Sequence, residues 1–65
     1  MNWEQAQGSW NQVKGKAKQM WGDLTDDELD TIAGKRDELV GRLQVKYGVS
    51  KEKAQEQADA WIRKL

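Results

Sequence analysis

The sequence predicts a small all-α protein, in which four short helices form two αα-hairpins packed crosswise in a SAM-domain-like arrangement. Apolar residues recur at alternating steps of three and four residues, which is the period of one helix face. No segment shows the two-residue alternation of a strand. Proline is absent from the 65 residues, and six glycines divide the chain into lengths typical of short helices.

The first expected helix ends at Gly22, where a left-handed residue would stop it. Asn2 or Ser9 could cap its start. Its apolar stripe comprises Trp3, Ala6, Trp10, Val13, Ala17, Met20 and Leu24.

The second expected helix begins at Thr25, because the hydroxyl of Thr25 and the carboxylate of Glu28 form a capping-box pattern. This helix is short, and it should end near Gly34. Its buried side consists of Leu29, Ile32 and Ala33.

The third expected helix runs from about Lys35 to Tyr47 and is closed by Gly48, and Ser50 caps the fourth. The apolar face of the third comprises Leu39, Val40, Leu43 and Tyr47. That of the fourth comprises Ala54, Ala58, Trp61, Ile62 and Leu65.

The glycines repeat. They fall at positions 8, 15 and 22 and again at 34, 41 and 48, and each run ends in an aromatic residue followed by glycine. We interpret this pattern as an approximate internal duplication, so the two hairpins should be related by approximate symmetry.

The predicted core takes residues from all four helices, and its tryptophans should supply much of the buried area. It consists of Trp10, Val13, Ala17, Trp21, Leu24, Leu29, Ile32, Leu39, Leu43, Tyr47, Ala58 and Trp61. Trp3, which precedes the first glycine, is expected at the periphery.

The composition restricts the possible functions. Eleven basic residues balance eleven acidic ones, and the chain has neither Cys nor His. Disulfides and zinc or haem sites are therefore excluded, and no cofactor or metal is expected. The first seven residues lack the basic and apolar regions of a signal peptide, and no apolar run reaches the ~20 residues of a membrane span. We expect a monomeric single domain over residues 1–65 in the cytoplasm.

Several stretches carry a family resemblance through their order and spacing. They are Gly15-Lys16-Ala17-Lys18 leading to Trp21-Gly22, Leu24-Thr25-Asp26-Asp27, Gly34-Lys35-Arg36-Asp37-Glu38-Leu39-Val40-Gly41, and Tyr47-Gly48. Together they resemble the CsbD-like family over nearly the whole chain. The resemblance implies a small bacterial protein of the general stress response, with two crossed helical hairpins and without catalytic residues.

The acidic cluster around the second helix start is the strongest candidate for catalysis or calcium binding. It comprises Asp23, Asp26, Asp27, Glu28 and Asp30. It lacks the ligand spacing and central Gly of an EF-hand loop, and no His accompanies it as a general base. Acids here suit the helix dipole, so we predict a solvated helix start in a non-enzymatic protein that takes no small-molecule substrate.

A possible interaction surface is suggested by glycines inside helices, each of which costs about 1 kcal/mol relative to alanine. The surface would comprise Gly15, Gly41, Lys14, Lys18, Lys35 and Arg36. The glycines could permit a partner or a second helix to approach, or could simply lie on solvent-exposed faces. The basic residues could equally balance charge within the molecule, and the acidic second helix would repel phosphate, so nucleic-acid binding is not expected.

The resemblance and the polar composition favour an abundant hydrophilic protectant whose binding partner, if any, is unknown. Two alternatives remain open. One is a small protein- or nucleic-acid-interaction module. The other is a peripheral binder of membrane surfaces through the Trp- and Lys-containing first helix, although core packing explains the same stripe.

Overall fold

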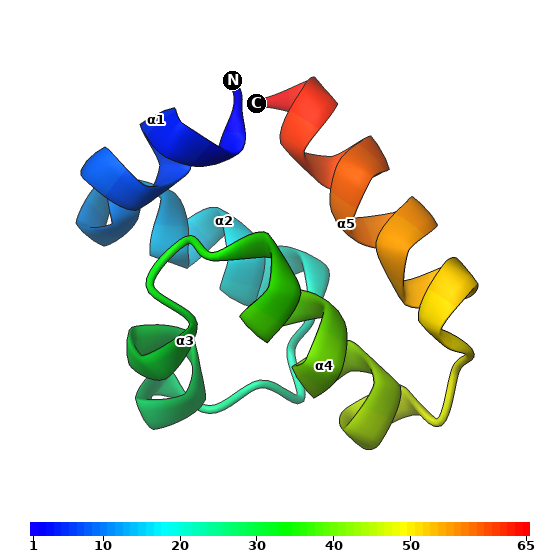
Figure 1. Cartoon of the computed structure of the whole chain (residues 1–65). Coiled ribbons are helices and arrows are strands. Elements are labelled where there is room, and N and C mark those ends of the chain that lie inside the picture. Colours follow the sequence, from blue (N-terminus) through cyan, green and yellow to red (C-terminus); the bar gives the residue numbers. More distant parts are fainter.

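The structure, a computed structural model, describes residues 1–65 as five α-helices without a strand (Figure 1). The helices are α1 (Trp3–Gly8), α2 (Trp10–Met20), α3 (Asp26–Ile32), α4 (Arg36–Tyr47) and α5 (Lys51–Lys64). The all-α class is therefore confirmed, but the count is five because the expected first helix is divided. The accessible surface of 4094 Å² is close to the about 4,200 Å² expected of a folded monomer of this mass.

The division of the first helix falls at Ser9, where the backbone has φ −120° and ψ 25°. A straight helix over residues 3–22 would measure about 30 Å. The longest dimension of the molecule is 28 Å. The bend keeps both halves against one core, since Ala6 on α1 and Trp10 and Val13 on α2 are all buried. The apolar period was therefore right about the face that bears Ala6, Trp10 and Val13, but wrong about the continuity of the helix and about Met20, which is 50% exposed.

Side-chain caps begin three of the helices. Asn2 Oδ1 accepts from the Gln5 amide at 2.8 Å at the start of α1. Thr25 Oγ1 accepts from the Glu28 amide at 3.1 Å at the start of α3, where Glu28 completes the predicted capping box. Ser50 Oγ accepts from the Lys53 amide at 3.1 Å at the start of α5.

The helix ends differ more from expectation. Gly48 closes α4 in the left-handed conformation, with φ 64°, as predicted. The prediction for Gly22 is wrong, because Trp21 is the C-cap of α2 and Gly22 does not have a positive φ. Ala33, expected on the buried side of the second helix, instead caps α3 with φ 51° and is only half-buried.

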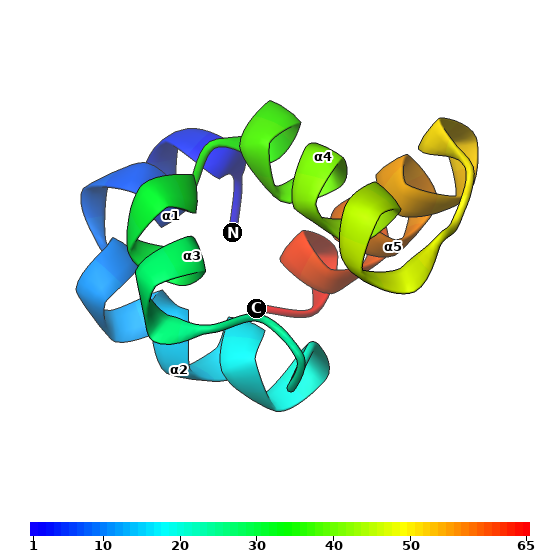
Figure 2. The ribbon, with the colours of Figure 1, turned by 90° about the horizontal axis from the view of Figure 1, so that it is seen from below.

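In the second half of the chain, α4 and α5 run side by side in opposite directions (Figures 1 and 2). The first half packs three helices in place of the expected two, so a crosswise pair of hairpins is not confirmed. Positions equated by the apparent duplication also differ, since Trp21 is 3% exposed and Tyr47 is 39% exposed. The chain termini meet, and the Met1 amino group donates to the Leu65 carbonyl at 3.1 Å.

One cluster of fifteen buried apolar residues forms the core, and it includes eleven of the twelve expected residues. Tyr47 is the exception. Its ring lies at the edge of the molecule, where its hydroxyl accepts from the Asp23 amide at 3.3 Å. The remaining buried residues are Ala6, Val40, Ala54 and Ile62.

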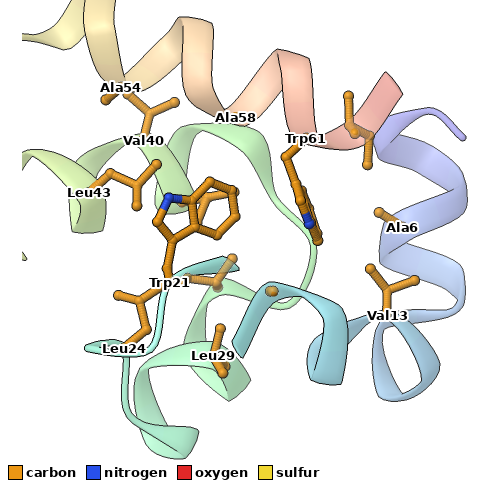
Figure 3. Packing of buried hydrophobic residues seen from close by; sticks show 14 of the residues in the cluster. Ala6, Val13, Trp21, Leu24, Leu29, Val40, Leu43, Ala54, Ala58 and Trp61 are labelled. Carbon is orange, nitrogen blue, oxygen red and sulfur yellow. The ribbon is translucent and has the colours of Figure 1, made fainter. Parts of the chain in front are cut away.

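Tryptophans join elements that are distant in sequence. The indoles of Trp21 and Trp61 lie within 5.2 Å, centroid to centroid, in an edge-to-face arrangement (Figure 3). Trp3 packs on the same Trp61 ring at 6.1 Å and is partly buried. Trp10 Nε1 donates to the Leu29 carbonyl at 2.7 Å and so ties α2 to α3.

The turn between α3 and α4 touches the backbone of α1. Gly34 has φ 82°, and a Cβ at this position would lie 2.7 Å from the Gln7 nitrogen and 2.8 Å from the Ala6 carbonyl carbon. No side chain fits there, so Gly34 is required both by its backbone conformation and by a close approach.

Two glycine variants separate these requirements. Gly48→Ala should cost about 1–2 kcal/mol of unfolding free energy, because the left-handed conformation disfavours a Cβ. Gly34→Ala should cost clearly more, since its Cβ also collides with the α1 backbone, whereas nothing lies within 4 Å of a Cβ at Gly48. Urea unfolding measures both, and equal losses would show that α1 does not pack closely on Gly34.

Candidate functional site

The structure does not gather the candidate basic residues into one free surface. Lys14 Nζ donates to Asp30 Oδ1 at 2.7 Å and links α2 to α3. Lys18 Nζ donates to the Leu24 carbonyl at 2.6 Å, so its charge lies at the turn after α2. Lys35 is exposed at the start of α4, without a side-chain cap bond.

Arg36 forms the best-defined ion pair of the molecule. Its Nε and Nη2 atoms donate to the two carboxylate oxygens of Asp59 at 2.8 and 3.0 Å, which joins α4 to α5. Two parallel hydrogen bonds of this kind are typical of arginine paired with a carboxylate and are stronger than bonds between neutral groups. The hydrogen bond from Arg36 lowers the pKa of Asp59, and the same contact raises the pKa of Arg36.

Two residues of the acidic cluster around the start of α3, Glu28 and Asp30, are likewise engaged within the molecule. Glu28 Oε1 accepts from the Thr25 amide at 3.0 Å and from Lys46 Nζ at 3.0 Å. Arg42 lies 3.8 Å from the other oxygen, so Glu28 connects the start of α3 to the last turns of α4. The Thr25 amide and Lys46 lower the pKa of Glu28. No group of three or more acidic residues is placed to hold a metal ion.

Three of the four candidate basic residues are therefore engaged within the molecule. Lys14, Lys18 and Arg36 each donate to an oxygen from another part of the chain, 6 to 23 residues away. The sequence could not have indicated these partners, because nothing local relates a lysine on α2 to an aspartate on α3.

The two candidate glycines face open space. Nothing lies within 4 Å of a Cβ built at Gly15 or at Gly41. The hypothesis that they permit close contact between helices of this chain is therefore wrong. Gly34 is the glycine with that role, and it could not be identified from the sequence, because the spacing of glycines does not show which of them lies close to another helix.

The surface has only shallow grooves that open to solvent. One of about 470 Å³ lies along the break between α1 and α2 and is lined mainly by polar residues. Another of about 260 Å³ lies between the end of α2 and α5, with Met20, Ala60 and Trp61 as its apolar part. Val45 on α4 is the most exposed large apolar side chain, at 83%. None of the five helices has the length and hydropathy that a membrane crossing requires.

Filling the open glycines tests whether they serve a purpose. The double variant Gly15→Ala plus Gly41→Ala should raise the unfolding free energy by about 1–2 kcal/mol, because alanine favours the helix and has room at both sites. Urea unfolding measures the gain. An unchanged or lower stability would contradict the open surroundings of these residues.

Acid should destabilise the protein through its paired carboxylates. Because folding lowers the pKa of Asp59 and Glu28, the unfolded chain binds protons more readily. The stabilisation is present above the ordinary carboxyl pKa of about 4 and is lost as the pH falls through the folded-state values. We expect the unfolding free energy to decline below about pH 5 in urea titrations.

A matched pair of variants assigns part of this decline. Asp59→Asn should show a shallower dependence on pH than the unaltered protein. Asp37→Asn is the control, because its carboxylate lies 4.0 Å from the same Arg36 but is 99% exposed. Identical pH profiles for all three proteins would contradict the assignment to the Arg36–Asp59 pair.

Comparison with known proteins places the chain in a family. Residues 4–56 match the CsbD-like family. A UPF0337 protein of Pectobacterium atrosepticum is 57% identical over 61 residues, covering 94% of this chain and 88% of that protein. A UPF0337 protein of Nitrosomonas europaea is 51% identical over 94% of this chain and 65% of its own length. The UPF0337 protein YjbJ of Escherichia coli K12 is 49% identical, over 94% of this chain and 88% of its own length. The chain therefore belongs to the CsbD-like family.

Proposed function

We propose that this protein is a folded, non-enzymatic protectant of the bacterial stress response. In the cytoplasm it would lie between other proteins and keep them hydrated and apart. The CsbD-like family is associated with the stress response, and its molecular activity is unknown. The observation that carries the proposal is the complete separation of the apolar core from a surface of balanced charge.

That separation is visible in the burial of the side chains. The sixteen buried residues include no polar or charged side chain. All eleven acidic and eleven basic residues therefore lie at least partly in water, and they sum to a net charge of zero. Without net charge, the molecule exerts no net repulsion on acidic or basic neighbours at long range. Its ionised groups keep their hydration, because burial would cost several kcal/mol per unpaired charge.

Apolar surface is scarce enough to limit aggregation at high concentration. Only four large apolar side chains are exposed, namely Met1, Met20, Val45 and Tyr47. Such isolated residues are normal on soluble proteins, whereas a large contiguous patch would favour association. A small protein with this surface can accumulate between other proteins and keep their apolar regions apart when water is lost.

The two alternatives have less support. Membrane-surface binding relied on the tryptophans of the first helix, yet Trp10 and Trp21 are buried and Trp3 packs against the core. Nucleic-acid binding relied on basic residues, of which Lys14, Lys18 and Arg36 are engaged within the chain. Membrane binding through Trp10 and Trp21 would have to open the core, and phosphate binding by Lys14, Lys18 or Arg36 would have to break these bonds.

Protection of a freeze-labile enzyme tests the proposal. We expect this protein to preserve more of the enzyme's activity through repeated freezing and thawing than serum albumin does at equal mass concentration. Because this protein is smaller, the same mass contains more molecules, and more of them lie between the enzyme molecules. Residual activity after a fixed number of cycles is the measurement. Protection no better than that of albumin would refute the protectant role.

A destabilised variant shows whether the fold matters. Leu29→Asp places a charge at a fully buried position and should unfold the chain while leaving the composition almost unchanged. If only folded surface charge protects, this variant should protect less than the unaltered protein and should aggregate with the enzyme. Equal protection by both would indicate a purely compositional effect and would contradict the role assigned to the folded surface.

A further inference from the structure

We propose that two copies of this chain exchange α1, with α1 and α2 of each copy straightened into one continuous helix by rotation at Ser9. The partner is thus a second copy of the same chain. This inference goes beyond the proposed function and does not depend on it.

The sequence on both sides of the break is that of one helix. The apolar stripe continues in steps of three and four from Trp3 through Ala6 and Trp10 to Val13, and there is no proline. Ser9 is the one residue between Trp3 and Met20 that lies outside a helix. The stripe would lie along one face of a continuous helix, whereas the single chain bends at Ser9, directly after Gly8.

The bend leaves backbone groups without backbone partners. Across the break, the backbone hydrogen bonds are those from the Ser9 amide to the Gln5 carbonyl and from the Gln12 and Val13 amides to the Ser9 carbonyl. The amides of Trp10 and Asn11 and the carbonyls of Ala6 and Gln7 make none. A continuous helix would pair Trp10 with Ala6 and Asn11 with Gln7, following the four-residue rule. Straightening therefore gains hydrogen bonds.

Little at the break itself opposes straightening. Ser9 occupies the N-cap position of α2, but its side chain makes no capping hydrogen bond. Its φ of −120° and ψ of 25° differ from helical values by about 60° each. The groove along this break is open to solvent, and the buried side chains on either side of it are Ala6 and Trp10.

The contacts that hold α1 are made with distant parts of the chain, and a second copy can supply them equally. Trp3 packs on Trp61, the backbone at Gln7 lies over Gly34, and the Met1 amino group donates to the Leu65 carbonyl. The same contacts form when α1 comes from a partner copy, and mutual exchange closes the assembly with two-fold symmetry.

If α1 leaves its own core, the position that it leaves fits only another copy of α1. Gly34 lacks a side chain where the α1 backbone approaches, and Ala6 is fully buried beside it. Departure of α1 would uncover Trp61, on which Trp3 packs and which is 5% exposed in the single chain. The α1 of another copy would restore both the contact at Gly34 and the burial of Trp61. Because this contact is between two chains, exchange becomes more favourable as the protein concentration rises.

Two variants move the equilibrium in opposite directions. Ser9→Ala should raise the dimer association constant about fivefold, because alanine favours the straight helix by ~0.5 kcal/mol in each chain. Asn11→Pro should lower it, since proline is tolerated in the first turn of α2 but lacks the N–H that the continuous helix would pair with Gln7. Gly15→Ala is the control, because it strengthens α2 by a similar or larger amount in both states and should leave the association constant unchanged. Light scattering across a concentration series measures all four proteins.

The identity of the exchanged element requires a second measurement. A cysteine appended to each terminus of the Ser9→Ala chain gives the only thiols, since the chain has no other cysteine. In the exchanged dimer Met1 of one copy meets Leu65 of the other, so oxidation should produce a covalent dimer on a non-reducing gel. A Ser9→Ala chain whose own termini are joined by a short linker should remain monomeric.

Three results would overturn the proposal. The first is that Ser9→Ala remains monomeric at every concentration. The second is a dimer whose disulfide bonds connect the termini of the same chain. The third is dimerisation of the chain with joined termini, because α1 cannot leave its own core in that protein.

Discussion

The contact on which the rest of the structure depends is the indole of Trp61, placed between Trp21 and Trp3 at centroid distances of 5.2 and 6.1 Å. It joins the last helix to the end of α2 and to the first helix, across 40 and 58 residues of sequence. A 65-residue chain without disulfides has little apolar area to bury, and aromatic rings supply the largest areas per residue.

The parts of the fold that could be predicted from the sequence are those set by neighbouring residues. The capping box of Thr25 and Glu28 and the left-handed Gly48 are local, and both are found. The break at Ser9 could not be predicted from the apolar period, because both halves carry one uninterrupted stripe. Trp21 and Tyr47 look equivalent in sequence, yet Trp21 is buried and Tyr47 lies at the edge.

The candidate surface could be predicted least well, for the same reason. Lysine and arginine positions are evident from the sequence, but whether they are free depends on partners such as Asp30 and Asp59, 16 and 23 residues away. The glycines show this even more clearly. Gly15 and Gly41 looked significant because they interrupt helices, whereas Gly34 has the decisive contact, with the α1 backbone. Only the tertiary structure distinguishes a glycine that faces open space from one that is in close contact with another helix.

The core and the surface together explain why exchange of α1 would be compatible with a role at high concentration. Concentrating most proteins promotes association through whatever apolar surface they expose. Here each α1 would cover the same core residues in a partner that it covers in its own chain, so exchange adds no exposed apolar area. The charged surface would remain in water, with its acidic and basic residues still balanced. Association of this kind ends at a closed pair, because mutual exchange satisfies both copies and leaves no free α1 to recruit a third.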